Sequence, residues 1–297
     1  MAHDNHIVDG VNLDVGPLYS LEDAKKEYLE LASDWEDPYG PPVVKEHNGV
    51  RVVRDDLLTG SKVRGGDCLI SSLPEHIDTI VYVQPRTGLA GVSIIDVAKN
   101  HGKKVKLFMP SSKQISYHQA CCIERGCDYE FHRIAAMPNL NRLAKLWAME
   151  HENSFFVPLG LKHPRVTAGI VKTTSSIPEP DEVYCATSTG VLTRALQIAW
   201  PNAKFTSVCV SRNMKAGELG RATPISEELA FTSAEKESNL PPFPTIDTYD
   251  GKAWKYVPKE SDKDILFWNV GAERELKDDT IYTKIDSYKD WPKNANN

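Results

Sequence analysis

Short apolar runs alternate with amphipathic patterns of helical spacing along most of this chain. Continuously apolar runs of about five residues are typical of strands buried on both faces, which occur in parallel sheets. The alternation predicts an α/β fold with parallel sheets covered by helices. The predicted strands span 50–53, 79–83, 105–109, 129–133, 155–159, 183–186, 206–210 and 265–270, and the predicted helices include 21–33, 90–100, 115–125, 140–150 and 191–200.

The length and composition fit a globular protein of this class. The chain has 297 residues, with 41% hydrophobic and 26% charged residues, which suits two lobes that each bury a core. Residues 222–248 contain four prolines and show weak periodicity, so we expect a long surface excursion or lid there.

The charge and the cysteines exclude several other classes. The net charge is −6 and the basic residues are scattered, so the bulk charge does not indicate nucleic-acid binding. No apolar run reaches the ~18 residues that span a bilayer, and the N-terminus is polar, so we expect a cytoplasmic protein without a membrane segment. The six cysteines lack zinc-site spacing, and we expect reduced thiols and no metal site.

A candidate phosphate loop follows the predicted strand at 183–186. Thr187, Ser188, Thr189 and Gly190 would place hydroxyls and backbone N–H groups at the positive end of the next helix. The alternative is an ordinary strand-to-helix turn with a hydroxyl cap.

Lys62 is a candidate Schiff-base lysine. Arg54, Asp55 and Asp56 follow a predicted strand, and Gly60, Lys62 and Arg64 come within the next eight residues. A lysine of this kind must be held at a strand-to-helix junction and be partly desolvated, so that its amine is neutral when it attacks an aldehyde. The alternative is a surface lysine.

Tyr249 and Asp250 form a third candidate, in the sequence Tyr-Asp-Gly-Lys. The phenol is able to move a proton, and the carboxylate is able to hold a pyridine nitrogen protonated. A surface turn is the alternative interpretation.

In this order, the three motifs resemble those of the fold type II pyridoxal-phosphate enzymes, nearest to 1-aminocyclopropane-1-carboxylate deaminase and D-cysteine desulfhydrase. The resemblance spans about residues 50–271. It implies two interleaved open parallel-sheet domains of the tryptophan synthase β type: a larger cofactor-binding domain from residues 1–75 and 165–297, and a smaller substrate-side domain from residues 76–164.

The resemblance also implies roles for individual residues. Lys62 matches the lysine that carries pyridoxal 5'-phosphate, and Tyr249 matches the tyrosine that faces the substrate. Asp250 matches the acidic residue at the pyridine nitrogen. The residues that match the phosphate cradle are Thr187, Ser188, Thr189 and Gly190.

The chain departs from the family pattern on the substrate side. Where the family has Gln-Ser-Asn-Gln/His at the start of a helix, this chain has Arg-Thr-Gly-Leu-Ala-Gly at residues 86–91, and Ser61 replaces the Asn before the lysine. We expect Arg86, Thr87 and Gly88 to form the substrate-binding loop, with the guanidinium and hydroxyl on a carboxylate.

The preferred function is that of a lyase or deaminase acting at the α-carbon of an amino acid. A decarboxylase of an amino-acid group on a larger molecule, such as a modified nucleotide or DNA base, is the main alternative. A catalytically silent relative and a phosphoribosyltransferase are further alternatives, the latter because residues 52–60 combine an apolar strand with paired carboxylates and Thr-Gly. A small-molecule amino acid or amino-acid-bearing compound is the expected partner, and the family implies a homodimer.

Overall fold

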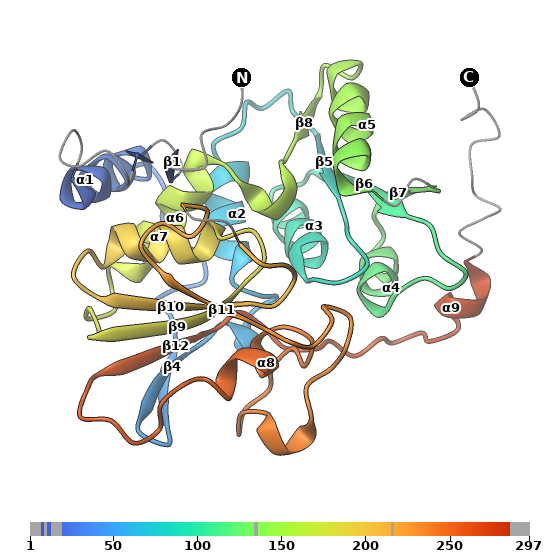
Figure 1. Ribbon diagram of the computed structural model, residues 1–297. Helices are drawn as coiled ribbons and strands as arrows, with labels where there is room; N and C mark the ends of the chain where they lie inside the picture. The colour runs from blue at the N-terminus through green and yellow to red at the C-terminus, as the bar shows by residue number, and fades with distance from the viewer. Residues whose placement is uncertain (1–6, 9–10, 13–19, 134–135, 215–216, 286–297) are drawn as a thin grey trace. The chain divides into compact units, whose positions relative to one another are not determined.

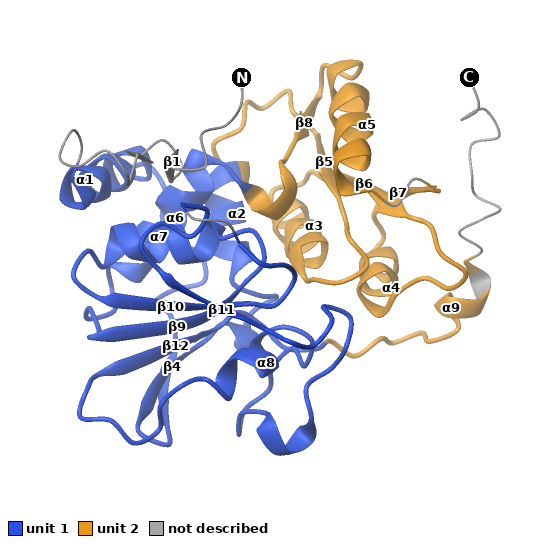
Figure 2. Ribbon diagram, viewed as in Figure 1, with its two compact units in different colours: residues 1–69, 162–273 blue, residues 70–161, 274–297 orange. Residues whose placement is uncertain are grey.

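The protein divides into two compact units, each built from separate stretches of the chain. The computed structural model describes residues 7–8, 11–12, 20–133, 136–214 and 217–285 (Figure 1). Unit 1 comprises residues 1–69 and 162–273, and unit 2 comprises residues 70–161 and 274–297 (Figure 2).

Unit 1 is organised around a six-stranded sheet with the order β11-β10-β9-β12-β4-β3. Neighbouring strands are parallel except at one edge, where β3 and β4 form an antiparallel pair. The strands are β3 (Val44–His47), β4 (Val50–Arg54), β9 (Glu182–Thr187), β10 (Lys204–Cys209), β11 (Thr223–Ser226) and β12 (Ile265–Asn269).

Strand β12 comes late in the chain but lies between β4 and β9. It pairs in parallel with both, so the carboxyl ends of all three strands meet at the same edge of the sheet. Each of these strands leads into a segment that carries one of the sequence motifs or borders one. In open α/β sheets, ligands bind outside this edge, where connections run in opposite directions.

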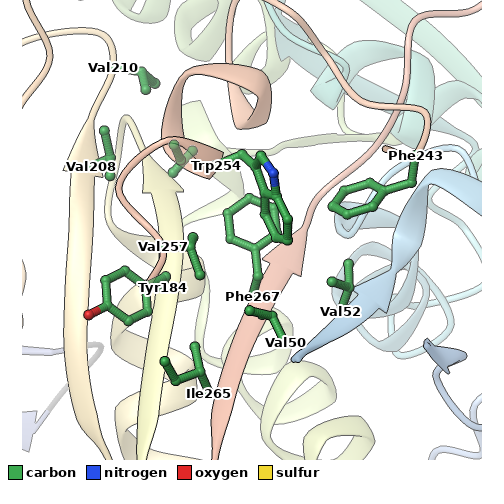
Figure 3. Packing of buried hydrophobic residues seen from close by; sticks show 12 residues of the cluster. Val50, Val52, Tyr184, Val208, Val210, Phe243, Trp254, Val257, Ile265 and Phe267 are labelled. Carbon is green, nitrogen blue, oxygen red and sulfur yellow. The ribbon is translucent and has the colours of Figure 1, made fainter. Parts of the chain in front are cut away.

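The sheet of unit 1 is apolar on both faces, as its two packing layers require. Helices α1 (Leu21–Leu31), α6 (Pro164–Thr174) and α7 (Val191–Ala199) contact one another and lie over one face (Figure 1). The short helix α8 (Asp250–Trp254) lies on the other face, where a cluster of aromatic rings surrounds Phe267 of β12 (Figure 3). Within it the Trp254 ring centroid lies 5.3 Å from that of Phe267 and 5.1 Å from that of Phe243.

Helix α2 (Lys62–Ile70) packs closely against α6. A Cβ atom built on Gly169 of α6 would lie 2.7 Å from Cys68 Cβ and 3.2 Å from Gly65 Cα, both of α2. Glycine is therefore required at position 169 for the two backbones to approach, and this approach fixes the axis of the helix that begins at Lys62.

Unit 2 contains a four-stranded parallel sheet with the order β7-β6-β5-β8. Its core includes Val81, Val83, Phe108, Leu140 and Ala144. The elements are β5 (Thr79–Val83), α3 (Ala90–Asn100), β6 (Lys104–Pro110), α4 (Tyr117–Glu124), β7 (Asp128–His132), α5 (Met137–Met149), β8 (Ser154–Phe156) and α9 (Ile281–Lys284); the remaining strands β1 (Ile7–Val8) and β2 (Val11–Asn12) pair with each other, in unit 1.

The predicted α/β class with two parallel-rich sheets is confirmed, and most predicted elements lie within two or three residues of their observed bounds. Helix α6 begins at Pro164, within residues 160–169, for which the sequence predicts a turn ahead of a helix. Strand β11 interrupts the proline-rich stretch at 222–248, and a 3₁₀ turn spans Glu237–Asn239. None of the described helices is long and apolar enough to cross a membrane.

The close contact of α2 and α6 gives a first prediction. We expect Gly169→Ala to lower the free energy of unfolding by about 2 kcal/mol, because backbone and Cβ atoms of α2 cannot move aside as the tip of a flexible side chain would. The measurement is urea unfolding followed by circular dichroism. Lys26→Ala on the exposed side of α1 is the control and should change stability by less than about 0.5 kcal/mol; an equally small effect at Gly169 would show that the helices are free to separate.

Candidate functional site

The three sequence motifs of unit 1 gather around the carboxyl ends of β4, β9 and β12. After β4, a 3₁₀ turn and a loop lead to Lys62, the first residue of α2. After β9, the loop 188–190 leads into α7, and Asp250 is the first residue of α8. The structure thus assembles Lys62, the predicted phosphate loop and the Tyr-Asp pair within one unit.

The main chain of Val270, directly after β12, links two of these motifs. Its N–H donates to Asp250 Oδ2 at 3.1 Å, and its carbonyl accepts from the N–H of Ser61 at 2.8 Å. The main chain of one residue, Val270, therefore holds both Asp250 and the start of α2.

Asp250 is completely buried and only half satisfied. Its Oδ1 atom has no hydrogen-bond partner among the described residues. Burial raises the pKa of this carboxyl well above its usual range, while the charge of Lys62 opposes that rise. A buried acceptor without a donor costs about 1–3 kcal/mol, so the free oxygen marks a position where a ligand N–H would be favoured.

Burial shifts the pKa of Lys62 in the opposite direction to that of Asp250. The Lys62 side chain is half-buried, and removal from water lowers its pKa, whereas the nearby charge of Asp250 raises it. Desolvation is the larger effect, so the neutral amine is favoured relative to an exposed lysine. The amine is thereby made a better nucleophile.

The loop after β9 enters α7 through a left-handed glycine. Gly190 has φ of 75° and ψ of 0° and caps α7, and Thr187 is buried at the end of the strand. A Cβ atom at Gly190 would lie 2.5 Å from Arg194 Nη1 and 2.9 Å from the Glu218 carbonyl oxygen. Glycine is thus required both by conformation and by space, and the loop presents its N–H groups at the N-terminus of the helix.

Tyr249 joins the phosphate loop to the carboxylate. Its hydroxyl donates to Ser188 Oγ at 3.2 Å, and it directly precedes Asp250. Burial raises the pKa of the phenol, so the hydroxyl stays protonated and remains a donor at neutral pH.

The paired aspartates before Lys62 have a structural role that the sequence did not reveal. Asp56 receives two hydrogen bonds of 2.7 Å from Arg54 and one of 2.8 Å from Asn269 Nδ2. Asp55 accepts from Trp268 Nε1 at 2.8 Å. These contacts tie the end of β4 to the end of β12.

The predicted substrate residues Arg86, Thr87 and Gly88 lie in unit 2, in the loop between β5 and α3. Their role in substrate binding stays a prediction. The loop is shaped by Gln84, which sequence reasoning missed: its fully buried amide donates to the carbonyls of Pro85 at 2.8 Å and Gly88 at 2.9 Å and accepts from the N–H of Gly91 at 2.9 Å. A polar residue at the end of an otherwise apolar strand was the available signal.

No protein-family model and no curated protein matches this chain. The fold is nevertheless shared with solved structures. An ACC deaminase homologue aligns with a TM-score of 0.67 at 16% identity, over 82% of this chain and 94% of its own. Maize serine racemase aligns with a TM-score of 0.61 at 14% identity, over 91% and 97% of the two chains. A pyridoxal 5'-phosphate-dependent aspartate racemase aligns with a TM-score of 0.55 at 12% identity, over 84% and 95%.

These similarities confirm the fold that the three motifs predicted. The two interleaved parallel-sheet units are those of the fold type II group, within which the ACC deaminase homologue and the serine racemase belong. At identities of 12–16%, the likeness establishes the fold and leaves the chemistry to be argued from the site residues.

The buried carboxyl of Asp55 gives a prediction for pH dependence. Burial raises its pKa from 3.8 to about 6, so the folded protein keeps a proton there that the unfolded chain releases. This group's contribution to stability is full below about pH 4 and is lost as the pH rises through about 6. Asp55→Asn, which keeps an acceptor for Trp268, should therefore gain stability relative to wild type by up to roughly 3 kcal/mol between about pH 4 and about pH 7.

Urea unfolding at the two pH values measures this difference. Asp262→Asn, at an exposed position, is the control and should show a constant difference from wild type. A stability difference for Asp55→Asn that does not change with pH would mean that Asp55 is already ionised in the folded protein at the lower pH.

Proposed function

We propose that the site in unit 1 binds pyridoxal 5'-phosphate and that the protein is an enzyme acting at the α-carbon of an amino acid or an amino-acid-bearing substrate, as a lyase or deaminase. The observation that carries this proposal is Asp250: a fully buried carboxyl with one free oxygen, electrostatically coupled to Lys62. A heteroaromatic nitrogen that shares a proton with this oxygen would satisfy it.

The other groups of the site fit the remaining parts of the cofactor. Lys62 offers an amine with a lowered pKa for covalent attachment to an aldehyde. Thr187, Ser188, Thr189 and Gly190 offer hydroxyl and N–H donors to a phosphate at the positive end of α7. The three requirements of one molecule, an amine, an acid and an anion site, are therefore met by residues of one sheet edge.

The residues divide the chemistry between them. When bound, the cofactor supplies an electron sink for the charge that develops at the substrate α-carbon. Asp250 would share a proton with the ring nitrogen: burial raises the pKa of this carboxyl, so it retains a proton that it can donate to that nitrogen. The amine of Lys62 and the hydroxyl of Tyr249 are the groups that move protons at the α-carbon and at the leaving group.

The similar structures support this class of reaction. They include a threonine deaminase, serine and aspartate racemases and a diaminopropionate ammonia lyase. Elimination of ammonia is the proposal that follows for this chain. Activity only with an amino-acid group attached to a larger molecule, with loss of carbon dioxide, would favour the decarboxylase alternative instead.

Covalent attachment at Lys62 is the first test of this function. We expect the purified protein, reconstituted with pyridoxal 5'-phosphate, to show a visible absorption band that borohydride removes, with the pyridoxyl mass on the peptide containing Lys62. Lys62→Ala should lack the band, because Lys62 is the lysine whose charge acts on Asp250. Lys259→Ala, at a half-buried lysine whose pKa burial lowers to about 8, is the control and should keep it. A wild-type protein that stays colourless after reconstitution would refute the proposal.

A second test separates binding from catalysis. Asp250→Asn keeps the size of the side chain but cannot hold a ring proton as an acid, so we expect the turnover rate to fall by roughly 100-fold while the cofactor still binds. Turnover is followed with the amino acid that shifts the visible band most strongly. Asp247→Asn, three residues earlier, is the control and should stay close to wild type; a loss of equal size in both variants would place the effect in the loop and not at the buried acid.

A further inference from the structure

Arg194 is a buried arginine that lies against the phosphate loop without belonging to any sequence motif. Only 5% of its surface is exposed, and its Nη1 atom donates to the carbonyl oxygens of Thr189 at 3.0 Å and Glu218 at 2.9 Å. A Cβ atom built at position 190 would lie 2.5 Å from the same nitrogen. The guanidinium therefore contacts the loop backbone directly.

The contact with Thr189 fixes the direction of a neighbouring N–H group. The peptide bonds of the described residues are all trans. In a planar trans peptide, the carbonyl and the following N–H point to opposite sides. Because the Thr189 carbonyl is held toward Arg194, the N–H of Gly190 must point away from Arg194, to the other side of the loop.

The second carbonyl that Arg194 contacts belongs to a segment that is itself fixed. Arg212 binds the Glu218 carboxylate with two hydrogen bonds of 2.9 and 2.6 Å. The amide of Gln197, which is fully buried in α7, donates to the carbonyl of Leu219 at 2.7 Å and accepts from the N–H of Arg221 at 2.8 Å. The segment 217–221 is thus fastened along α7, and it prevents the guanidinium from swinging away from Thr189.

We propose that Arg194 is a positioning residue for phosphate recognition, which holds the Gly190 N–H toward the phosphate group of the ligand. This inference rests on the proposed function, since it names how the same site selects a phosphate monoester over its dephosphorylated form. Arg194 acts through the peptide bond between Thr189 and Gly190. It binds the carbonyl on one side of this peptide and thereby directs the N–H on the other side.

The phosphate preference, defined as the dissociation constant for pyridoxal divided by that for pyridoxal 5'-phosphate, is the ratio that tests this role. The affinity for pyridoxal 5'-phosphate is compared with the affinity for pyridoxal, which lacks the phosphate, in the full-length protein. We expect Arg194→Met to lower this ratio by at least about tenfold, the effect of losing one well-aligned hydrogen bond to a charged acceptor, while the affinity for pyridoxal changes little. A general loss of structure would weaken both ligands alike.

Arg221→Met is the matched control. Arg221 also fastens the segment 217–221 to the end of α7, through the carbonyl of Trp200 at 2.7 Å, and its side-chain hydrogen bonds among the described residues go to the carbonyls of Ala203, Gln197 and Trp200. It should therefore keep the wild-type ratio. Should Arg194→Met fail to fold, Arg194→Lys takes its place, because the shorter lysine side chain ends one bond before the Nη1 position that binds both carbonyls and is expected to lose part of the ratio.

The outcomes separate this inference from the proposed function. A wild-type protein that does not bind pyridoxal 5'-phosphate at all refutes the proposed function. A wild-type protein that prefers the phosphate form, with an unchanged preference in the folded Arg194 variant, overturns the positioning role alone. An equal loss in Arg221→Met also overturns it, because the effect would then come from the segment 217–221 as a whole.

Discussion

The site depends on the insertion of β12 between β4 and β9. The parallel pairing places Asn269 beside Arg54 and Trp268 beside Cys185, so that the chain leaves the sheet at Val270 between two earlier strands. Two interactions then follow from this position: the main chain of Val270 binds both Asp250 and Ser61, and the side chains before it bind the paired aspartates. A strand at the edge of the sheet could not contact both motifs.

Two buried carboxyls of unit 1 differ in how fully their oxygens are hydrogen-bonded. Asp56 has a bidentate arginine and an amide as partners, which offsets its desolvation and makes it a structural group. Asp250 has one backbone N–H and an electrostatic interaction with a lysine that is itself desolvated. A carboxyl in this state destabilises the protein alone and stabilises a complex in which the ligand supplies the missing donor, so binding and folding are linked at this residue.

The sequence predicted the alternation of strands and helices because a parallel strand that is buried on both faces is a continuous apolar run. Such a run can be recognised locally, without knowing which other strands it pairs with. It missed β3 and β11, which are edge strands with largely exposed, polar residues, and α8, which has five residues, all of them buried, and therefore shows no helical period. The same limit applies to the site. The motifs at Lys62, Gly190 and Asp250 were visible as separate segments, but their meeting depends on the sheet order, and the Val270 contacts are made by the main chain, which leaves no trace in residue type.

The proposed phosphate loop, residues 187–190, is held from two sides before any ligand arrives. On the sheet side, Thr193 in the first turn of α7 lies 3.2 Å from Cys185 Sγ and accepts from Ser207 Oγ at 3.1 Å, all three being buried. On the outer side, Arg194 holds the carbonyl of Thr189. Donors that are fixed in advance lose little conformational entropy on binding, so their hydrogen bonds contribute more of their strength to affinity. A rigid site of this kind suits the proposed role, since a cofactor stays bound through many turnovers, whereas a substrate loop must release its ligand in each one.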